Sequence, residues 1–394
     1  MTETMTESET PWQAMFHRLL AEPGPREALQ NAEPETRLDA AVYHDPRRYQ
    51  AEQSQLFRRL PLCLGHADQL REPGSILARE IVGLPLLLVR DASDEIGIFL
   101  NVCRHRGARL VTENDATCQK SSLVCPYHGW TYGLDGALAA VPLREAFPTL
   151  DRAARGLIRL PSVVRHGLIW AVLDPNLPKP DMARYLGPVD AELAAIGLGQ
   201  HRFFRQHAVR RATNWKLIVD AFMEVYHVKR LHSGTIGPFF SDSVAISDHF
   251  GPHQRMLVAR DQLGQLRDQP PAQWHPQRHG TLVHLIFPNT ILIYHPDYIS
   301  HLGIFPTAPD ETLFVHTMLT PEAPADERAK AHWDRSFDLI DRQVFHDEDL
   351  AVCEQIQRGL VSGIGQNFLL GRFESNVRRF HETIAAALQP EPGN

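Results

Sequence analysis

Two short cysteine–histidine pairs constrain this chain more than any other feature of its sequence. Cys103 and His105 form a C-x-H pair, and Cys125 and His128 form a C-x-x-H pair after a spacer of 19 residues. Glycines close behind each pair permit the tight turns from which both side chains of a pair reach one metal centre. Two thiolates and two imidazoles suit either a tetrahedral zinc ion or a [2Fe–2S] cluster in which the histidines bind one iron.

The composition excludes several classes of protein. The 394 residues carry a formal net charge of -7, which argues against binding nucleic acid through a general basic surface. Five cysteines are too few for a disulfide framework in a chain of this length. No apolar run approaches the roughly 20 residues of a membrane span, and the acidic start MTETMTESET lacks the features of a signal peptide. We therefore expect a cytoplasmic protein with no nucleic-acid or membrane partner.

The spacing of apolar residues divides the chain into three regions. Residues 1–49 carry an N-terminal tail and one short amphipathic helix. Short strand-like runs between Gly, Pro and Asp turns predict a small all-β domain over residues 50–175. Residues 176–394 mix strand and helix patterns, which predicts an α+β domain with helices packed on an antiparallel sheet.

Several local elements are predicted within these regions. They are a helix that begins at Thr10-Pro11, an extended connection over 24–48, a helix over 215–231, a long loop over 261–280 that is either a lid over a site or simply mobile, strands over 281–287, 290–294, 303–306 and 313–319, a long helix that begins near Asp326, and a last helix over 374–388.

A second group of metal-binding side chains lies in the predicted helix over 215–231. Glu224, His227 and His232 follow the pattern E-x-x-H-x-x-x-x-H, and Asp220 would share a helix face with Glu224 and His227. His232 comes five residues after His227, about 140° further around an ideal helix. The helix must therefore end or bulge between them if both bind one ion. Otherwise the motif is a polar helix face with two incidental histidines.

Together, the two groups resemble the motifs of a known enzyme family. C-R-H-R-G followed by C-P-Y-H-G-W is similar to the Rieske domain of ring-hydroxylating oxygenases. N-W-K followed by E-x-x-H-x-x-x-x-H is similar to the mononuclear iron motif of the same family. The resemblance covers residues 50 to 380. It implies an all-β Rieske domain over 50–175 and a helix-grip (START-like) catalytic domain over 176–394.

The resemblance also implies the ligands of two metal centres. Cys103 and Cys125 would hold one iron of the Rieske [2Fe–2S] cluster, and His105 and His128 would hold the other. A mononuclear Fe(II) would be bound by the side chains of His227, His232 and Asp349, with Glu348 as the rival for the third position. Two histidines and one carboxylate leave positions open for dioxygen.

The resemblance further implies how electrons reach these centres. The chain lacks a G-x-G-x-x-G fingerprint, so a separate reductase, with or without a ferredoxin, must supply electrons from NAD(P)H. Arg104, Arg106 and Arg109, beside the cluster, are candidates for a docking patch; the alternative is that they are ordinary surface arginines. Family members are homotrimers in which the cluster of one subunit serves the iron of the next. Glu224 would bridge the two centres between His227 and a cluster histidine of the neighbouring subunit.

The predicted function is that of a terminal oxygenase acting on a small, aromatic substrate, with monooxygenation favoured over dihydroxylation. An apolar pocket for it would be lined by Val219, Phe222, Met223, Phe239, Leu285, Ile293 and His295. The alternative is oxidation of a quaternary ammonium or betaine compound, for which Tyr226, Tyr294, Tyr298 and Trp274 would supply an aromatic cage. Two non-enzymatic alternatives are a Rieske electron-transfer protein and a zinc-binding protein.

Overall fold

The computed structural model describes residues 11–21, 34–112, 117–274, 276–363 and 367–389. It divides the chain into two compact units. The small unit consists of Gln50–Tyr185 and Leu193–Phe203, and the large unit consists of Met1–Tyr49, Leu186–Glu192 and Phe204–Asn394. None of the described helices is long and apolar enough to cross a membrane.

The small unit consists mainly of antiparallel strands, which confirms the predicted all-β fold. The strands are β2 Leu62–His66, β3 Ser75–Ile81, β4 Leu84–Arg90, β5 Ile96–Leu100, β6 Thr117–Gln119, β7 Leu123–Val124, β8 Thr131–Tyr132, β9 Leu138–Ala140, β10 Arg159–Leu160, β11 Ser162–Arg165 and β12 Leu168–Ala171. They form sheets of order β10-β5-β4-β3-β6, β11-β12-β2 and β7-β8-β9. Short helices occur at η2 Gln53–Phe57, η3 Ala67–Leu70, η4 Arg144–Ala146, η5 Ala153–Arg155 and η6 Leu198–Gln200.

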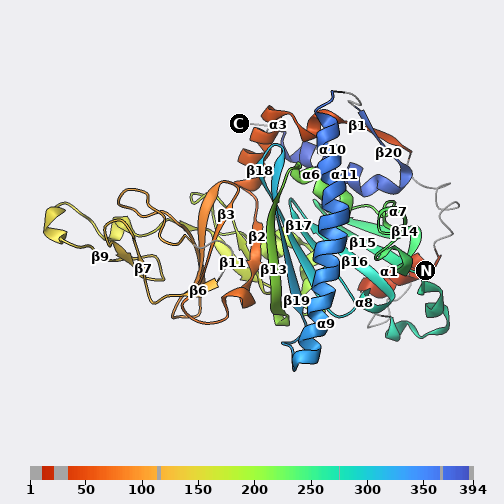
Figure 1. Ribbon diagram of the computed structural model, residues 1–394, viewed down its shortest axis with the longest axis horizontal. Helices are drawn as coiled ribbons and strands as arrows, with labels where there is room; N and C mark the ends of the chain where they lie inside the picture. The colour runs from red at the N-terminus through yellow and green to blue at the C-terminus, as the bar shows by residue number, and fades with distance from the viewer. Residues whose placement is uncertain (1–10, 22–33, 113–116, 275, 364–366, 390–394) are drawn as a thin grey trace, which may run out of the picture. The chain divides into compact units, whose positions relative to one another are not determined.

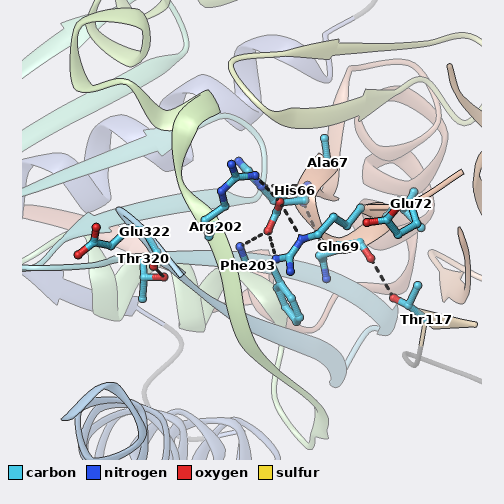
Figure 2. Close-up of polar contacts among 12 residues, drawn as sticks. His66, Ala67, Gln69, Glu72, Thr117, Arg202, Phe203, Thr320 and Glu322 are labelled. Atoms are coloured by element: carbon cyan, nitrogen blue, oxygen red, sulfur yellow. Dashed lines mark hydrogen bonds and ion pairs between the residues drawn. The ribbon is translucent and has the colours of Figure 1, made fainter. Parts of the chain in front are cut away.

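One buried carboxylate ties the distant segment Leu193–Phe203 into the small unit. Asp68 accepts a hydrogen bond from the backbone N–H of Phe203 at 2.8 Å and pairs with Arg71 at 2.6 Å and Arg202 at 3.1 Å (Figure 2). Burial opposes ionisation of Asp68, but the hydrogen bonds from Arg71, Phe203 and Arg202 outweigh it and lower its pKa. The ionised carboxylate therefore stabilises this connection at neutral pH.

The large unit is built on one seven-stranded sheet. Its strands are β13 Arg202–Arg211, β14 Phe240–Phe250, β15 His253–Arg260, β16 Gly280–Ile286, β17 Thr290–Tyr294, β18 Ile299–Ala308 and β19 Glu311–Thr320. Their order is β13-β19-β18-β17-β16-β15-β14, and β14 to β19 pair antiparallel, each with the next. The two strand pairs predicted between residues 281 and 319 are therefore confirmed. A separate two-stranded sheet pairs β1 Thr36–Asp39 with β20 Asn367–Leu370.

Helices pack on this sheet, as the predicted α+β class requires. The helices of the large unit include α1 Pro11–Ala21, η1 Ala40–Tyr43, α6 Trp215–Phe222, α7 Val228–Leu231, η7 Gly237–Phe239, α9 Glu327–Phe337, η10 Asp338–Leu350, α10 Ala351–Leu360, η11 Arg372–Glu374 and α11 Ser375–Ala387. Helix α4 Met182–Leu186 lies in the small unit except for its last residue, and α3 Pro46–Glu52 and α5 Pro188–Ile196 are divided between the two units. Figure 1 shows α9, η10 and α10 as one long blue helix. Asp326 caps its start by accepting from the N–H of Ala329, and the middle section η10 is π-helical.

Two of the predicted elements were wrong in detail. The 24–48 connection is not extended throughout, because β1, η1 and α3 occupy its described part. The 261–280 loop contains three short helical turns, η8 Leu263–Asp268, η9 Pro271–Gln273 and α8 Pro276–His279. The spacer between the cysteine pairs contains β6, which pairs with β3. Helix α1 is confirmed, whereas its predicted cap Thr10 lies outside the described residues.

The predicted helix over 215–231 is two helices. Asn214 begins α6, because its side chain accepts a hydrogen bond from the N–H of Lys216 at 3.0 Å. The helix ends at Phe222, and α7 does not begin until Val228. The turn between them separates Asp220, on α6, from Glu224 and His227, which a continuous helix would have placed on the same face.

Candidate metal centres and active-site cavity

The two cysteine–histidine pairs lie on two loops with the same backbone geometry. In each, the cysteine C=O accepts from the glycine four residues later, Gly107 at 2.9 Å and Gly129 at 3.0 Å. Each cysteine N–H donates to the carbonyl five residues later at 2.8 Å. Both glycines have positive φ, 82° and 70°, which side-chain-bearing residues rarely adopt. Glycine at these two positions therefore allows both loops to adopt the same backbone conformation.

The loops bring the four predicted cluster ligands to one end of the small unit. Cys103 and Cys125 are buried at 2% and 3% exposure, whereas His105 is half-buried and His128 is exposed. The two imidazole rings meet edge to face, with centroids 4.8 Å apart and an interplanar angle of 66°. Two buried thiols beneath two outward imidazoles are the donor set that a Rieske [2Fe–2S] cluster needs, so these residues fit that group.

Two aromatic residues contact the predicted cluster ligands. The Trp130 ring stacks on His105 at 4.8 Å and 8°. The Tyr132 hydroxyl lies 3.3 Å from Cys103 Sγ and accepts from the N–H of Arg104 at 2.9 Å. Hydrogen bonds to ligand sulfur tune the reduction potential of such clusters.

The three predicted iron ligands converge in the large unit. Asp349 Oδ1 lies 3.1 Å from His232 Nε2 and 3.6 Å from His227 Nε2. This oxygen is buried and accepts no hydrogen bond from any described residue. Glu224 and Glu348 hold the Nδ1 atoms of His227 and His232 respectively, the second at 2.6 Å. Each Nε2 is therefore directed at Asp349, and the set fits a mononuclear iron.

The helix does not break between the two histidines, as their convergence on one ion was expected to require, but before His227, between α6 and α7. His227 precedes the first residue of α7 and His232 follows its last, so the imidazoles flank one helical turn. Gly237 closes this turn by donating to the His232 carbonyl at 2.8 Å. A Cβ on Gly237 would lie 2.7 Å from that oxygen, so a larger residue would displace it.

The rival ligand Glu348 lies behind His232 rather than beside its Nε2. It also accepts from Thr235 Oγ1 at 2.8 Å. The predicted alignment of Asp220 with Glu224 and His227 is wrong, because Asp220 instead binds the Tyr43 hydroxyl at 2.6 Å and His381 at 3.0 Å.

The acids around the two imidazoles favour positive charge. Burial alone would lower the pKa of His227, but Glu224 and Asp349 together raise it. Burial likewise opposes protonation of His232, and Asp349 and Glu348 raise its pKa. A site that stabilises a proton between two imidazoles also stabilises a metal cation there.

The three converging residues open into a cavity of about 230 Å³ within the large unit. Of the residues predicted to line it, Phe222, Phe239, Ile293 and His295 do so, whereas Val219, Met223 and Leu285 do not. Of the predicted aromatic cage, Tyr298 lines the cavity, and Tyr226, Tyr294 and Trp274 do not. The other aromatic residues in the wall are Phe240 and Phe345.

One functional residue of the cavity escaped the sequence analysis. Arg260 ends β15 and lines the cavity, although the rest of this strand is mostly apolar. Its Nε donates to the Gly280 carbonyl and its Nη2 to Thr281 Oγ1, both at 3.1 Å. Among the residues that the structure describes, no carboxylate pairs with it. Strand β15 carries two arginines, Arg255 and Arg260, and neither belongs to a motif, so only the spatial arrangement identifies Arg260.

Comparison with known proteins agrees with this geometry. Residues 61–151 match the Rieske [2Fe-2S] domain, and residues 198–390 match the ring hydroxylating alpha subunit catalytic domain. The carnitine monooxygenase oxygenase subunit of Acinetobacter pittii is 26% identical over 336 residues, which cover 81% of this chain and 84% of that protein. The glycine betaine monooxygenase oxygenase subunit of Chromohalobacter salexigens is 32% identical over 247 residues, 62% and 53% of the two chains.

Two solved structures have the same fold. A quaternary ammonium Rieske monooxygenase in complex with L-carnitine superposes with a TM-score of 0.77 at 21% identity, over 93% of this chain and 100% of that chain. Naphthalene 1,2-dioxygenase from a Rhodococcus species, bound to indole, gives a TM-score of 0.76 at 20% identity, over 98% and 100%.

The chain therefore belongs to the Rieske-type ring-hydroxylating oxygenase alpha subunits. It is a non-haem iron oxygenase whose cofactors are a Rieske [2Fe–2S] cluster and a mononuclear iron. Such subunits need a reductase and oxidise small substrates with O2. The zinc-binding and purely electron-transferring alternatives are set aside by this assignment.

Proposed function

We propose that this protein is the oxygenase subunit of a monooxygenase that acts on a small carboxylated quaternary ammonium compound, of the betaine type. The observation that carries the proposal is the unpaired guanidinium of Arg260 in a cavity walled by aromatic rings. Such a compound has a cationic ammonium end and an anionic carboxylate end. The cavity offers a chemical partner for each.

The aromatic wall suits the ammonium end. Four phenylalanines and one tyrosine line the cavity, namely Phe222, Phe239, Phe240, Phe345 and Tyr298. The faces of aromatic rings attract quaternary ammonium groups, whose methyl groups also favour an apolar surface. The carboxylates of Glu224 and Asp349, which lie in the same lining, add negative potential near the converging histidines.

Arg260 suits the carboxylate end. Its guanidinium lies 5.4 Å from the Phe240 ring, and burial lowers its pKa, although a nearby Tyr298 opposes this. A desolvated cation without a carboxylate partner is destabilising, so an anionic substrate group would satisfy it. Arginine is the preferred partner of carboxylates because two of its N–H groups match both oxygens.

The comparisons favour this alternative over the aromatic substrate first expected from the sequence. Both of the relatives described above are named for quaternary ammonium substrates, carnitine and glycine betaine. A neutral aromatic hydrocarbon would leave Arg260 without a counter-charge.

We assign Cys103, His105, Cys125 and His128 to the cluster and His227, His232 and Asp349 to the mononuclear iron. These centres, when bound, supply the electrons and activate dioxygen. The overall reaction is C–H + O2 + 2 e⁻ + 2 H⁺ → C–OH + H2O. If the hydroxylated carbon is bonded to nitrogen, the C–N bond then breaks as the carbonyl forms, and a tertiary amine and a proton are released.

A substrate panel tests the proposal. The holoenzyme, a surrogate reductase and NADH are incubated with glycine betaine, L-carnitine, choline, benzoate or naphthalene, and products are identified by mass spectrometry. We expect product from a substrate that carries both an ammonium and a carboxylate group. Turnover of naphthalene with none of glycine betaine or carnitine would show that the proposal is wrong.

Replacing Arg260 with glutamine is expected to raise KM for the carboxylated substrate about 10- to 100-fold, since a charge-assisted hydrogen bond contributes about 1.5–3 kcal/mol. Both metal contents should stay unchanged. Lys229→Gln is the matched control, because Lys229 pairs with Asp261 and does not line the cavity. An equal KM in Arg260→Gln and wild type would remove the carboxylate subsite from the proposal.

We also propose that the protein is a homotrimer in which electrons pass between subunits. Inter-subunit electron transfer is described for a quaternary ammonium Rieske monooxygenase that shares the fold. Glu224, which holds His227 Nδ1, would then extend the connection to a cluster histidine of the next subunit. Near the cluster, Arg106 binds the Tyr127 hydroxyl at 2.6 Å and Arg109 pairs with Glu80 at 2.7 Å. With Arg104 they would form the docking patch for the reductase or a ferredoxin.

Subunit complementation tests this route. A Cys125→Ser chain should lack the cluster and a Cys125-intact Asp349→Ala chain should lack the mononuclear iron, so each alone should be inactive. Coexpression of the two, with different affinity tags, should restore part of the activity in doubly tagged oligomers. Absence of activity in purified mixed oligomers would mean that electrons stay within one chain.

A further inference from the structure

A chain of buried polar side chains crosses the sheet of the large unit. It runs through His207 on β13, Asp341 on η10, His316 on β19, Ser300 on β18 and His295 at the end of β17. The strands β13, β19, β18 and β17 are consecutive neighbours in the sheet. The chain therefore passes from strand to strand, with one detour through the long helix.

Every link in this chain is a hydrogen bond of ordinary length. His207 Nδ1 lies 2.8 Å from Asp341 Oδ2, and His316 Nδ1 lies 2.9 Å from Asp341 Oδ1. His316 Nε2 lies 3.0 Å from Ser300 Oγ, which in turn lies 3.1 Å from His295 Nε2. Asp341 and His316 thus use two polar atoms, one toward each neighbour, whereas Ser300 uses its single Oγ toward both.

The two ends of the chain differ in their access to water. The His207 side chain is 45% exposed. At the other end, His295 lines the active-site cavity, and no described residue hydrogen bonds its Nδ1. Between them, His316 and Ser300 are fully buried and Asp341 is 5% exposed. The chain therefore joins the solvent-exposed imidazole of His207 to the cavity through buried side chains.

We propose that His207, Asp341, His316, Ser300 and His295 form a proton relay that supplies the oxygenase reaction from solvent. The reaction consumes two protons for each O2 reduced, and the cavity wall is largely apolar. An imidazole binds a proton on one nitrogen and releases another from the second, and a hydroxyl oxygen accepts one proton as it gives up its own, so a proton can pass without any side chain crossing the sheet.

The proton count of the relay is balanced. In one arrangement Asp341 is ionised and the hydrogens of His295, Ser300 and His316 all point toward it. In the other, Asp341 carries one more proton and all hydrogens point toward the cavity, with His295 Nδ1 protonated. Release of that proton into the cavity, with one proton moving along each link, converts the second arrangement into the first. Uptake of one proton through His207 onto Asp341 restores the second arrangement once His316 and His295 have changed tautomer and the Ser300 hydroxyl has turned toward His295.

The charge states of the middle members suit this role. Burial lowers the pKa of His316, so its imidazole is neutral and has one nitrogen free to accept. Burial would raise the pKa of Asp341, but hydrogen bonds from His316 and His207 outweigh it and lower the pKa. The carboxylate therefore provides the resting position toward which the imidazole N–H groups point.

A metal ion is the competing explanation for part of this chain. Atoms of His207, Asp341 and His346 lie within 4.8 Å of one another, which is a possible three-ligand set. However, both Asp341 oxygens are already hydrogen bonded, and the Arg211 guanidinium lies 3.4 Å from His346 Nδ1. A neighbouring cation disfavours a second cation, so we favour the relay.

Ser300→Ala removes the single oxygen that joins His316 to His295. We expect oxygen uptake with the substrate found in the panel to fall about tenfold or more, with a solvent deuterium isotope effect above the wild-type value. Ser300→Thr keeps the hydroxyl and should retain activity. Metal content and thermal midpoint are measured for both, because a relay defect should leave them unchanged.

His207→Ala separates a relay from a structural role at the half-exposed end. Turnover should fall and should be restored by added imidazole, whereas imidazole should not restore Ser300→Ala. The control is His332→Ala, which removes another half-exposed imidazole bound to a carboxylate, Asp297, away from the relay. Wild-type rates and isotope effects in both His207→Ala and Ser300→Ala would overturn the proposal.

The relay does not depend on the proposed substrate. If the panel yields no product, oxygen uptake and peroxide formation by the chemically reduced protein replace it as the measurement, since reduction of O2 to H2O2 also consumes two protons. The variants are expected to slow this reaction in the same order. If the wild-type protein reduces O2 and the variants reduce it at the same rate, the relay is wrong. This outcome would leave the proposed substrate untouched.

Discussion

Replacing Asp349 with alanine is expected to reduce product formation to the background of the assay. The variant should lose its mononuclear iron and keep the two irons of the Rieske cluster, because the two groups of ligands lie in separate compact units. The measurement is iron content by elemental analysis together with the EPR signal of the reduced cluster. The loss follows from the donor set, since two imidazoles without the carboxylate lack the charge that holds Fe(II).

The matched control lies one helical turn away. His346→Gln changes a polar side chain on the same π-helical segment, three residues before Asp349, without touching His227 or His232. It should retain the mononuclear iron and turnover. Loss of the cluster signal in Asp349→Ala, or normal iron content in that variant, would contradict the two-site assignment. If Glu348→Ala lost the mononuclear iron and Asp349→Ala kept it, Glu348 rather than Asp349 would be the third iron ligand.

Much of the fold could be predicted because its signals are local. Strand alternation and turn residues mark β4, β5 and β12, and the apolar residues Trp333, Phe337, Ile340 and Val344 are buried along the long helix as their spacing requires. The cluster residues follow from short motifs whose side chains are neighbours in sequence. The helix break after Phe222 has no such marker, so a single helix was expected and two were found.

The rest of the site depends on contacts between distant segments. Asp349 joins His227 across more than one hundred positions, and only the resemblance pointed to it. Arg260 and His316 belong to strands whose neighbours are apolar, so each reads locally as an ordinary strand residue. Their role emerges only when the seven-stranded sheet places them beside a cavity or a chain of hydrogen bonds. Propensity and periodicity carry no information about such pairings.

Replacing Glu224 with glutamine is expected to keep both metal centres and lower turnover about 100-fold, the upper range for a residue that orients a metal ligand. Glu224 holds three groups at once. One oxygen contacts His227 Nδ1, and the other accepts from the N–H groups of Tyr226 and His227. Glutamine has the same shape, so the turn between α6 and α7 should survive, but its amide lacks the charge that fixes the imidazole N–H.

The position of the loss within the cycle distinguishes the roles that Glu224 could serve. Stopped-flow spectroscopy of the reduced variant should show cluster oxidation by O2 slowed to the same degree as product formation, if Glu224 links the cluster to the iron. If it only orients His227, cluster oxidation should stay fast and the iron affinity should fall. Glu348→Gln is the matched control, because Glu348 holds His232 Nδ1 in the same way and lies behind the iron site. Normal turnover in Glu224→Gln would contradict both roles, since no other described carboxylate contacts His227 Nδ1.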